Sequence, residues 1–235
     1  VCGSYRAVWQ ICGMNMPSSG GTTVLQTLGM LEPFNVGALQ PQSAAAVHLI
    51  SEAYRLAYAD RAKYMADSDF VFVPVEGLID KDYLGSRAAM IDLSRSMGIP
   101  QPGTPPGVVL ARGRDNSIDL PSTSHISIID RRGNAVAMTT TIESAFGSHQ
   151  FVRGFLLNNE LTDFNLDRTL NVQTGDPGAN DVAPGKRPRS SMSPTIVFKG
   201  HEPILAYGSP GGSTIINTVF NTTLNLIDHG MSIQQ

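Results

Sequence analysis

The sequence is poor in charged residues, and this shortage excludes several kinds of partner. Only 16% of the 235 residues are charged, and the formal net charge is −3. This composition provides no basic surface to attract a phosphate backbone or an anionic membrane, so we expect neither as a partner. A hydrophobic content of 41% is enough for a sizeable core, in one large domain or two small ones. The expected ligand is therefore a small molecule.

Cysteine is scarce as well. Cys2 and Cys12 do not make a disulfide framework, although an N-terminal hairpin would bring them together, and they leave the cellular compartment undecided. No apolar run reaches transmembrane length, so we expect no membrane insertion. No metal-ligand spacing links the five histidines, and we expect neither a metal nor another cofactor. Residues 208–212 do not read Gly-x-Ser-x-Gly, which argues against a serine hydrolase with a nucleophile elbow.

A β-hairpin is the most regular pattern in the chain, and it is predicted for residues 122–142. Gly133 suits the left-handed position of a three-residue loop with a G1 bulge, so Asp130 should pair with Asn134. Carried outward, this register sets Thr123 opposite Thr141 at cross-strand contact distance. Their face is polar and also carries His125, Ser127 and Thr139. The other face is largely apolar and is predicted to be buried; it carries Ile126, Ile128, Val136, Met138, Thr140 and Ile142.

Helices and strands are predicted on both sides of this hairpin. Apolar residues at helical spacing predict helices over residues 22–31, 43–62, 80–93 and 213–229. Strand patterns cover residues 5–11, 154–159, 195–198 and 204–207, the last two as a second hairpin. Ser43 and Asp80 are predicted N-caps, and residues 18–21 are interpreted as the capped start of the first helix. The core face of the second helix is predicted to carry Val47, Ile50, Tyr54 and Tyr58.

Two long stretches show no periodicity. Residues 98–122 are rich in proline and glycine, and we predict a segment that is exposed or poorly ordered. This segment runs directly into Thr123. Residues 163–188 are rich in Asp, Asn, Gly and Pro and predict a long irregular loop. Loops of that length in a compact domain are usually functional or mobile.

A series of short motifs resembles the γ-glutamyltransferase (γ-glutamyltranspeptidase) family, in the family's own order and over essentially the whole chain. Upstream, residues 17–21 and 58–61 resemble the end of the large subunit of that family. Residues 123–127 are similar to the Thr-Thr-His-aromatic-Ser start of its small subunit. The motifs that follow are Asp130-x-x-Gly133-Asn134-Ala135-Val136, Phe146-Gly147-Ser148, Leu156-Leu157-Asn158-Asn159-Glu160, Asp163-Phe164, Pro188-x-Ser190-Ser191-Met192-Ser193-Pro194-Thr195-Ile196 and Gly208-Ser209-Pro210-Gly211-Gly212-Ser213.

The resemblance implies an α+β fold, the αββα sandwich of the N-terminal-nucleophile hydrolases, incomplete at both ends. Residues 1–122 would be the C-terminal part of a large-subunit-like region that ends in a Pro/Gly-rich linker. Residues 123–235 would be a small-subunit-like catalytic region within the same globular domain. The remainder of the large subunit is an expected partner. Typical bacterial members would suggest a periplasmic or extracellular location, and a cytoplasmic one stays open.

The chemistry implied by the resemblance centres on Thr123. A threonine hydroxyl needs a base to take its proton, and a free N-terminal α-amine has a pKa near neutrality. Autoproteolysis at the Ser122–Thr123 bond would release that amine. Thr141 is then expected to hold the rotamer of Thr123. The backbone N–H groups of Gly211 and Gly212, before a helix, match the oxyanion hole of the family.

Substrate-binding positions are also implied. Glu160, Asp163, Ser190 and Ser191 match positions that bind the α-amino and α-carboxylate groups of a glutamyl donor. Glu143 stands where well-characterised transferases have Asn, and its charge changes what is presented to the donor.

Three functions remain open on this basis. The first is a γ-glutamyl hydrolase or transferase, with water, an amino acid or a peptide as acceptor of the glutamyl group. The second is an acylase for glutaryl or cephalosporin-type amides. The third is an unprocessed, inactive scaffold. The arginine that binds the substrate carboxylate in the family lies upstream of the residues matched here, so we expect little turnover from these 235 residues alone.

Overall fold

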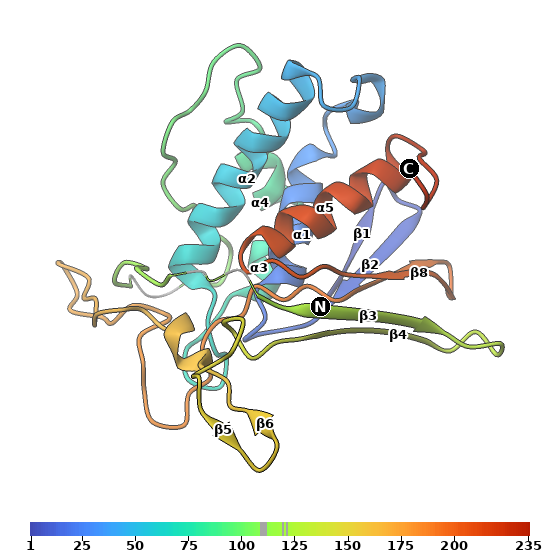
Figure 1. Ribbon diagram of the computed structural model, residues 1–235. Helices are drawn as coiled ribbons and strands as arrows, with labels where there is room; N and C mark the ends of the chain where they lie inside the picture. The colour runs from blue at the N-terminus through green and yellow to red at the C-terminus, as the bar shows by residue number, and fades with distance from the viewer. Residues whose placement is uncertain (109–111, 119, 121) are drawn as a thin grey trace.

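The computed structural model describes residues 1–108, 112–118, 120 and 122–235 (Figure 1). It is a mixed α/β fold with antiparallel sheets. Helices cover one side of a four-stranded sheet of order β1-β2-β7-β8, and the β3–β4 hairpin lies against β7 and β8 on the side away from the helices. In the part of the chain that the structure describes, no helix combines the length and the apolar character needed to cross a bilayer.

The chain opens with a short hairpin, β1 (Cys2–Tyr5) and β2 (Trp9–Gly13). The predicted strand over residues 5–11 is wrong, because a turn interrupts it at Arg6 and Ala7, whose φ angles are 50° and 55°. No glycine marks that turn in the sequence. The hairpin pairs Cys2 with Cys12, and the two residues form a disulfide, as their expected approach allowed.

The described residues form five α-helices, of which four match predicted helices with changed ends and one, the short α3, was not predicted. They are α1 (Gly20–Leu31), α2 (Ala44–Tyr64), α3 (Val75–Leu78), α4 (Lys81–Ala88) and α5 (Thr214–Ile227), with 3-10 turns η1 (Val36–Ala38) and η2 (Glu160–Asp163). Both predicted N-caps are confirmed: Ser43 accepts from the Ala46 N–H at 3.3 Å and Asp80 from the Tyr83 N–H at 2.9 Å. The third predicted helix ends early, at Ala88, where the N–H groups of Met90 and Ile91 bond to carbonyls three residues back instead of four. The Asp92 carboxylate then accepts from the Ser94 N–H and forms a turn in place of a further helical turn.

The core surrounds α1, all of whose residues are buried between the sheet and the helices α2, α4 and α5. The predicted core face of α2 is wrong at Val47, which is 52% exposed; Leu49, Ala53 and Leu56 fill the core instead. The Tyr54 hydroxyl donates to a backbone carbonyl of α5 at 2.9 Å. The start of α1 also differs from expectation, since Ser19 makes no capping bond. Its hydroxyl points to other partners, described below.

The central hairpin is formed by β3 (Ser124–Ile129) and β4 (Ala135–Thr140). Its predicted register is confirmed: Ser124 pairs with Thr140, the Asp130 N–H donates to the Asn134 carbonyl at 3.0 Å, and Gly133 has a φ of 83°. The predicted burial of the apolar face is wrong, because Ile126, Ile128, Val136 and Met138 are about half exposed, at 48%, 56%, 49% and 49%.

The hairpin instead turns its polar face towards β7 and β8. The His125 ring lies so close to Gly208 that a Cβ atom there would meet the ring at 2.4 Å. The same ring contacts the Thr139 hydroxyl at 2.8 Å and the Ser127 hydroxyl at 2.9 Å. Small and polar side chains allow this close approach. The apolar face is left towards solvent.

The remaining strands are short. The predicted strand over residues 154–159 is replaced by a small hairpin, β5 (Phe151–Val152) and β6 (Phe155–Leu156), which projects from the body of the molecule (Figure 1). Gly154, with a φ of 95°, makes its turn. The second predicted hairpin is confirmed as β7 (Thr195–Lys199) and β8 (Glu202–Tyr207). Residues 164–194 contain no helix or strand among those described, as expected of an irregular loop.

The Pro/Gly-rich segment before Thr123 is largely exposed or half-buried, as predicted, but a few of its residues are anchored to the body of the molecule. The Gly103 N–H donates to the buried Asp60 carboxylate at 2.7 Å, and the Tyr64 hydroxyl donates to the Gly103 carbonyl at 2.6 Å. Pro105 and Gly113 are buried, while all the other described positions of residues 98–122 are exposed or half-buried. The prediction also covered residues 109–111, 119 and 121, which lie outside the described residues. The segment is thus anchored at particular points.

Candidate active site

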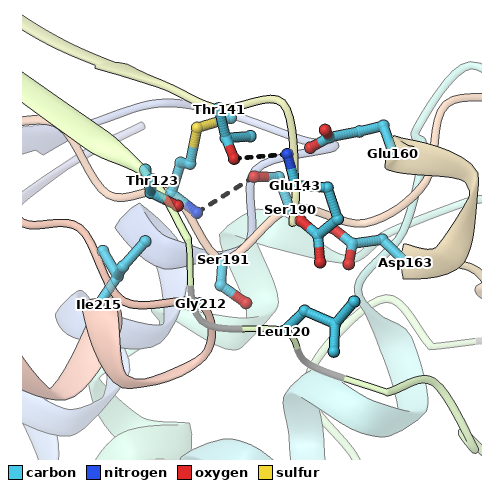
Figure 2. Close-up of a pocket in the computed structure, with 11 residues that line it drawn as sticks. Leu120, Thr123, Thr141, Glu143, Glu160, Asp163, Ser190, Ser191, Gly212 and Ile215 are labelled. Atoms are coloured by element: carbon cyan, nitrogen blue, oxygen red, sulfur yellow. Dashed lines mark hydrogen bonds between the residues drawn. The ribbon is translucent and has the colours of Figure 1, made fainter. Parts of the chain in front are cut away.

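A small cleft brings together every predicted site residue except Gly211 (Figure 2). Its walls come from the start of β3, the end of β4, the η2 turn, the segment before β7 and the start of α5. Segments from both predicted regions of the chain therefore meet here. The lining residues are Leu120, Thr123, Thr141, Glu143, Glu160, Asp163, Ser190, Ser191, Met192, Gly212 and Ile215.

Two threonine hydroxyls meet at one carbonyl oxygen. Thr123 Oγ1 donates to the Ser122 carbonyl at 2.5 Å, and Thr141 Oγ1 donates to the same oxygen at 2.7 Å. Thr141 Oγ1 in turn accepts from the Glu143 N–H at 2.8 Å, a bond drawn in Figure 2. This arrangement follows from the hairpin register, which places the two threonines one step beyond the Ser124–Thr140 pair. The Ser122 carbonyl is thereby held between two hydroxyl donors.

Three carboxylates stand on the other side of the cleft. One oxygen from each of Glu143, Glu160 and Asp163 lies within 4.8 Å of the others, and Glu143 is only 5% exposed. Burial, together with the charge of Asp163, raises the pKa of Glu160 to about 7. Such a cluster favours a cation. An ammonium group or a metal ion could bind there, and the expectation of no metal, which was based on the histidines, did not consider these acids.

The backbone of Glu143 adopts a left-handed conformation, with a φ of 72°. Asn adopts that conformation more readily than Glu, and non-glycine residues there cost about 1–2 kcal/mol. An Asn in place of Glu143 would therefore fit this backbone better. Strain of this kind is often found at functional sites.

Ser190 and Ser191 are held by neighbours on both sides. Ser190 Oγ accepts from the Met192 N–H at 3.1 Å, and the Ser190 N–H donates to the Pro17 carbonyl at 3.0 Å. Ser191, 9% exposed, accepts a hydrogen bond from the Arg61 guanidinium at 2.6 Å. Arg61 was noted in the sequence only as part of a motif, with no role at the site.

The two glycines before α5 adopt backbone conformations that suit glycine, with φ angles of 131° for Gly211 and 58° for Gly212. Their carbonyls accept the first N–H groups of the helix, from Thr214 and Ile215. Among the described residues neither glycine N–H has a protein acceptor. These donors therefore remain for a ligand at the positive end of the helix dipole.

The chain before Thr123 narrows the cleft. Leu120 forms part of its lining, and the free volume is only about 20 Å³, room for roughly one water molecule. A larger ligand therefore needs the Leu120 side chain to move. The sequence indicated an approach segment here, but it did not indicate that Leu120 would reach the site.

Solved structures establish the class of fold to which this site belongs. The chain superposes on a cephalosporin acylase from Bacillus halodurans with a TM-score of 0.80 at 24% identity, over 98% of this chain and 38% of that one. This likeness concerns the fold alone.

Sequence comparison then identifies the family. The Gamma-glutamyltranspeptidase family profile matches residues 1–235, and the chain belongs to that family. It is 40% identical to a glutathione hydrolase proenzyme from Bacillus subtilis, over 100% of this chain and 40% of the relative. It is 36% identical to an acylase ACY 1 proenzyme from a Pseudomonas species, over 99% and 38%. The chain thus spans about 40% of the length of these curated relatives.

Proposed function

We propose that these residues carry the active site of a γ-glutamyl amide hydrolase or transferase, with Thr123 as its nucleophile. The observation that carries the proposal is the Ser122 carbonyl, which accepts hydrogen bonds from Thr123 and Thr141 in a cleft lined by three carboxylates and two serines. Family membership, and the names of the curated relatives as glutathione hydrolases and acylases, agree with it.

The first reaction is cleavage of the Ser122–Thr123 bond. Thr123 Oγ1 attacks the Ser122 carbonyl carbon, its proton passes to the departing amide nitrogen, and an ester joins the two residues. Water then hydrolyses the ester, which leaves a carboxylate on Ser122 and a free α-amine on Thr123. The Thr141 hydroxyl, 2.7 Å from the carbonyl oxygen, stabilises the negative charge that develops there. Once the bond is cut, Leu120 and Ser122 are no longer tied to Thr123 and can leave the cleft.

Turnover uses the new amine as a base. It takes the proton of Thr123 Oγ1, the oxygen attacks the γ-carbonyl of the donor, and the proton is passed to the leaving amine. A γ-glutamyl ester of Thr123 results, and water or an acceptor amine resolves it. The N–H groups of Gly211 and Gly212 stabilise the oxyanion in both halves of the reaction.

The electrostatics of the cleft favour a γ-glutamyl donor over a glutaryl donor. Burial, and after it the charge of Asp163, raises the pKa of Glu160 to about 7, and a donor ammonium group placed beside these three acids would favour their ionised forms. A glutaryl group has no ammonium and would add a negative charge. We therefore assign the donor ammonium to Glu143, Glu160 and Asp163 and its carboxylate to Ser190 and Ser191.

The proposal includes the αββα sandwich, with residues 1–122 and 123–235 as parts of one domain that is cut between them. The helical layer, the four-stranded sheet and the β3–β4 hairpin are consistent with three of its layers. The exposed apolar face of the hairpin suits a further layer supplied by the rest of the precursor.

The test follows bond cleavage and donor choice together, in the complete precursor that carries these residues. Intact-mass analysis should find one polypeptide that ends at Ser122 and one that begins at Thr123. The processed protein should hydrolyse a γ-glutamyl para-nitroanilide much faster than the glutaryl anilide. Faster turnover of the glutaryl compound would identify the acylase function instead. An uncut chain without turnover would identify an inactive scaffold.

A further inference from the structure

Arg61 lies behind the proposed carboxylate-binding serines. It belongs to α2, is 4% exposed, and reaches two hydroxyl groups at once. Its Nη2 atom donates to Ser191 Oγ at 2.6 Å, and its Nε atom donates to Ser19 Oγ at 2.9 Å. Both bonds involve a charged donor in a buried setting, where such bonds are roughly twice as strong as neutral ones.

The bond to Ser191 restricts what that hydroxyl can do. A serine hydroxyl has one proton to donate and two positions for accepting hydrogen bonds. Arg61 fills one accepting position from the buried side, so the proton of Ser191 remains for a ligand. Among the residues that the structure describes, no protein acceptor takes this proton, and Ser191 lines the cleft. The hydroxyl is thus prepared to donate to an anion.

The bond to Ser19 extends the same control to Ser190. Ser19 Oγ donates to the Ser190 carbonyl at 2.8 Å, and the Ser19 N–H donates to the same oxygen at 2.8 Å. Because Arg61 occupies an accepting position of Ser19 Oγ, the Ser19 proton is directed to Ser190. One side chain therefore orients both serines, one directly and one through Ser19. This also explains why Ser19 does not cap α1.

The charge of Arg61 strengthens the effect. The guanidinium contacts the Ser191 oxygen directly, and a hydroxyl that accepts from a cation becomes a better donor to an anion.

We propose that Arg61 is a positioning residue that makes Ser190 and Ser191 selective for donors carrying an α-carboxylate. The inference rests on the proposed function and extends it from the two serines to the residue that orients them. Donor discrimination is the property that should depend on Arg61. A role in stability alone would leave that discrimination unchanged.

The test compares two donors in the complete precursor. γ-Glutamyl para-nitroanilide carries both the ammonium and the carboxylate, whereas γ-aminobutyryl para-nitroanilide carries only the ammonium. In Arg61→Gln, kcat/KM for the glutamyl donor should fall roughly 10- to 100-fold, mainly through KM, as expected for loss of a charge-assisted contact. The value for the aminobutyryl donor should fall less than about threefold, so the ratio between donors collapses.

Arg55→Gln is the matched control, because Arg55 lies on the same helix with its side chain 44% exposed, bound to Gly98 and Glu52 away from the cleft. It should keep the donor ratio of the parent. Ser191→Ala should lower the ratio as Arg61→Gln does, and the double variant should lower it no further than the larger single effect. Additive losses in the double variant would overturn the action through Ser191.

If Arg61→Gln does not fold, Arg61→Lys provides the test in its place. It keeps the charge but cannot reach both serines with a planar fork, so an intermediate ratio is expected. Equal losses for both donors in either folded variant would overturn the inference while the parent still hydrolyses γ-glutamyl anilide. A parent that hydrolyses neither donor would overturn the proposed function, and the inference with it.

Discussion

Ser191 and Thr123 line the same cleft, but they are held in different ways. Ser191 is 9% exposed and bonded to a buried arginine of the long helix α2. Thr123 begins a hairpin whose outer apolar face is about half exposed, and its hydroxyl bonds the residue that precedes it. Ser191, assigned to donor binding, is thus held by buried neighbours. Thr123, assigned to the covalent chemistry, lies at the start of a hairpin that is less deeply packed.

The largest effect is expected from a substitution at Thr123, at the start of the hairpin. Thr123→Ala removes the proposed nucleophile, so the Ser122–Thr123 bond should stay uncut and γ-glutamyl turnover should fall by at least about 10³-fold. Intact mass and an anilide assay measure the two outcomes. Thr140→Ala, on the exposed face of β4, is the control and should leave both unchanged within about twofold. Cleavage in Thr123→Ala would contradict the assignment of the nucleophile.

For the free energy of unfolding, the larger effect is expected in the helical core and the smaller effect in the hairpin. Leu56 is 0% exposed in the core beside α1, and Leu56→Ala should lower the free energy of unfolding by about 2–5 kcal/mol. Ile128 is 56% exposed, so Ile128→Ala should lower the free energy of unfolding by less than about 1 kcal/mol. Urea unfolding of the 235-residue chain measures both. A loss for Ile128→Ala that matches the core value would mean that the hairpin face is covered, and the contrast would then disappear.

The smallest effect concerns the pH dependence of donor binding, which should follow the protonation of Glu160. Because burial and the charge of Asp163 raise the pKa of Glu160 to about 7, its carboxyl becomes protonated below that pH. KM for a γ-glutamyl donor should therefore rise several-fold as the pH falls from 8 to about 6, since a neutral acid attracts the donor ammonium less. Glu160→Gln should abolish this part of the profile. The profile of the glutaryl anilide, which has no ammonium, should not show it.

The same shift has a consequence for folding. The folded state binds this proton more tightly than the unfolded chain, in which the pKa of glutamate is about 4.5. Stability contributed by Glu160 is therefore fully present below about pH 4.5 and is lost as the pH rises through about 7. Glu160→Gln should consequently be more stable relative to the parent at pH 8 than at pH 5. Thermal unfolding at the two pH values measures this difference, and an unchanged difference would contradict a perturbed Glu160.

Much of the secondary structure could be predicted from local chemistry. Gly133 determined the turn and hence the register of the central hairpin, and Ser43 and Asp80 marked the starts of two helices. The failures occurred where the local signal was absent or ambiguous. The turn at Arg6 and Ala7 contains no glycine, and the Asp92 turn competes with a helix by a side-chain bond.

The sequence by itself determined the alternation of faces, the register that sets Thr123 beside Thr141, and the ordered motifs that indicated the family. These depend on residues close in the chain, whose geometry is set by backbone periodicity and turn chemistry. Only the tertiary structure decided which hairpin face packs against β7 and β8, and that three acids share one cleft. It alone brought Arg61 to Ser191, because contacts between residues so distant in sequence depend on how the layers pack together.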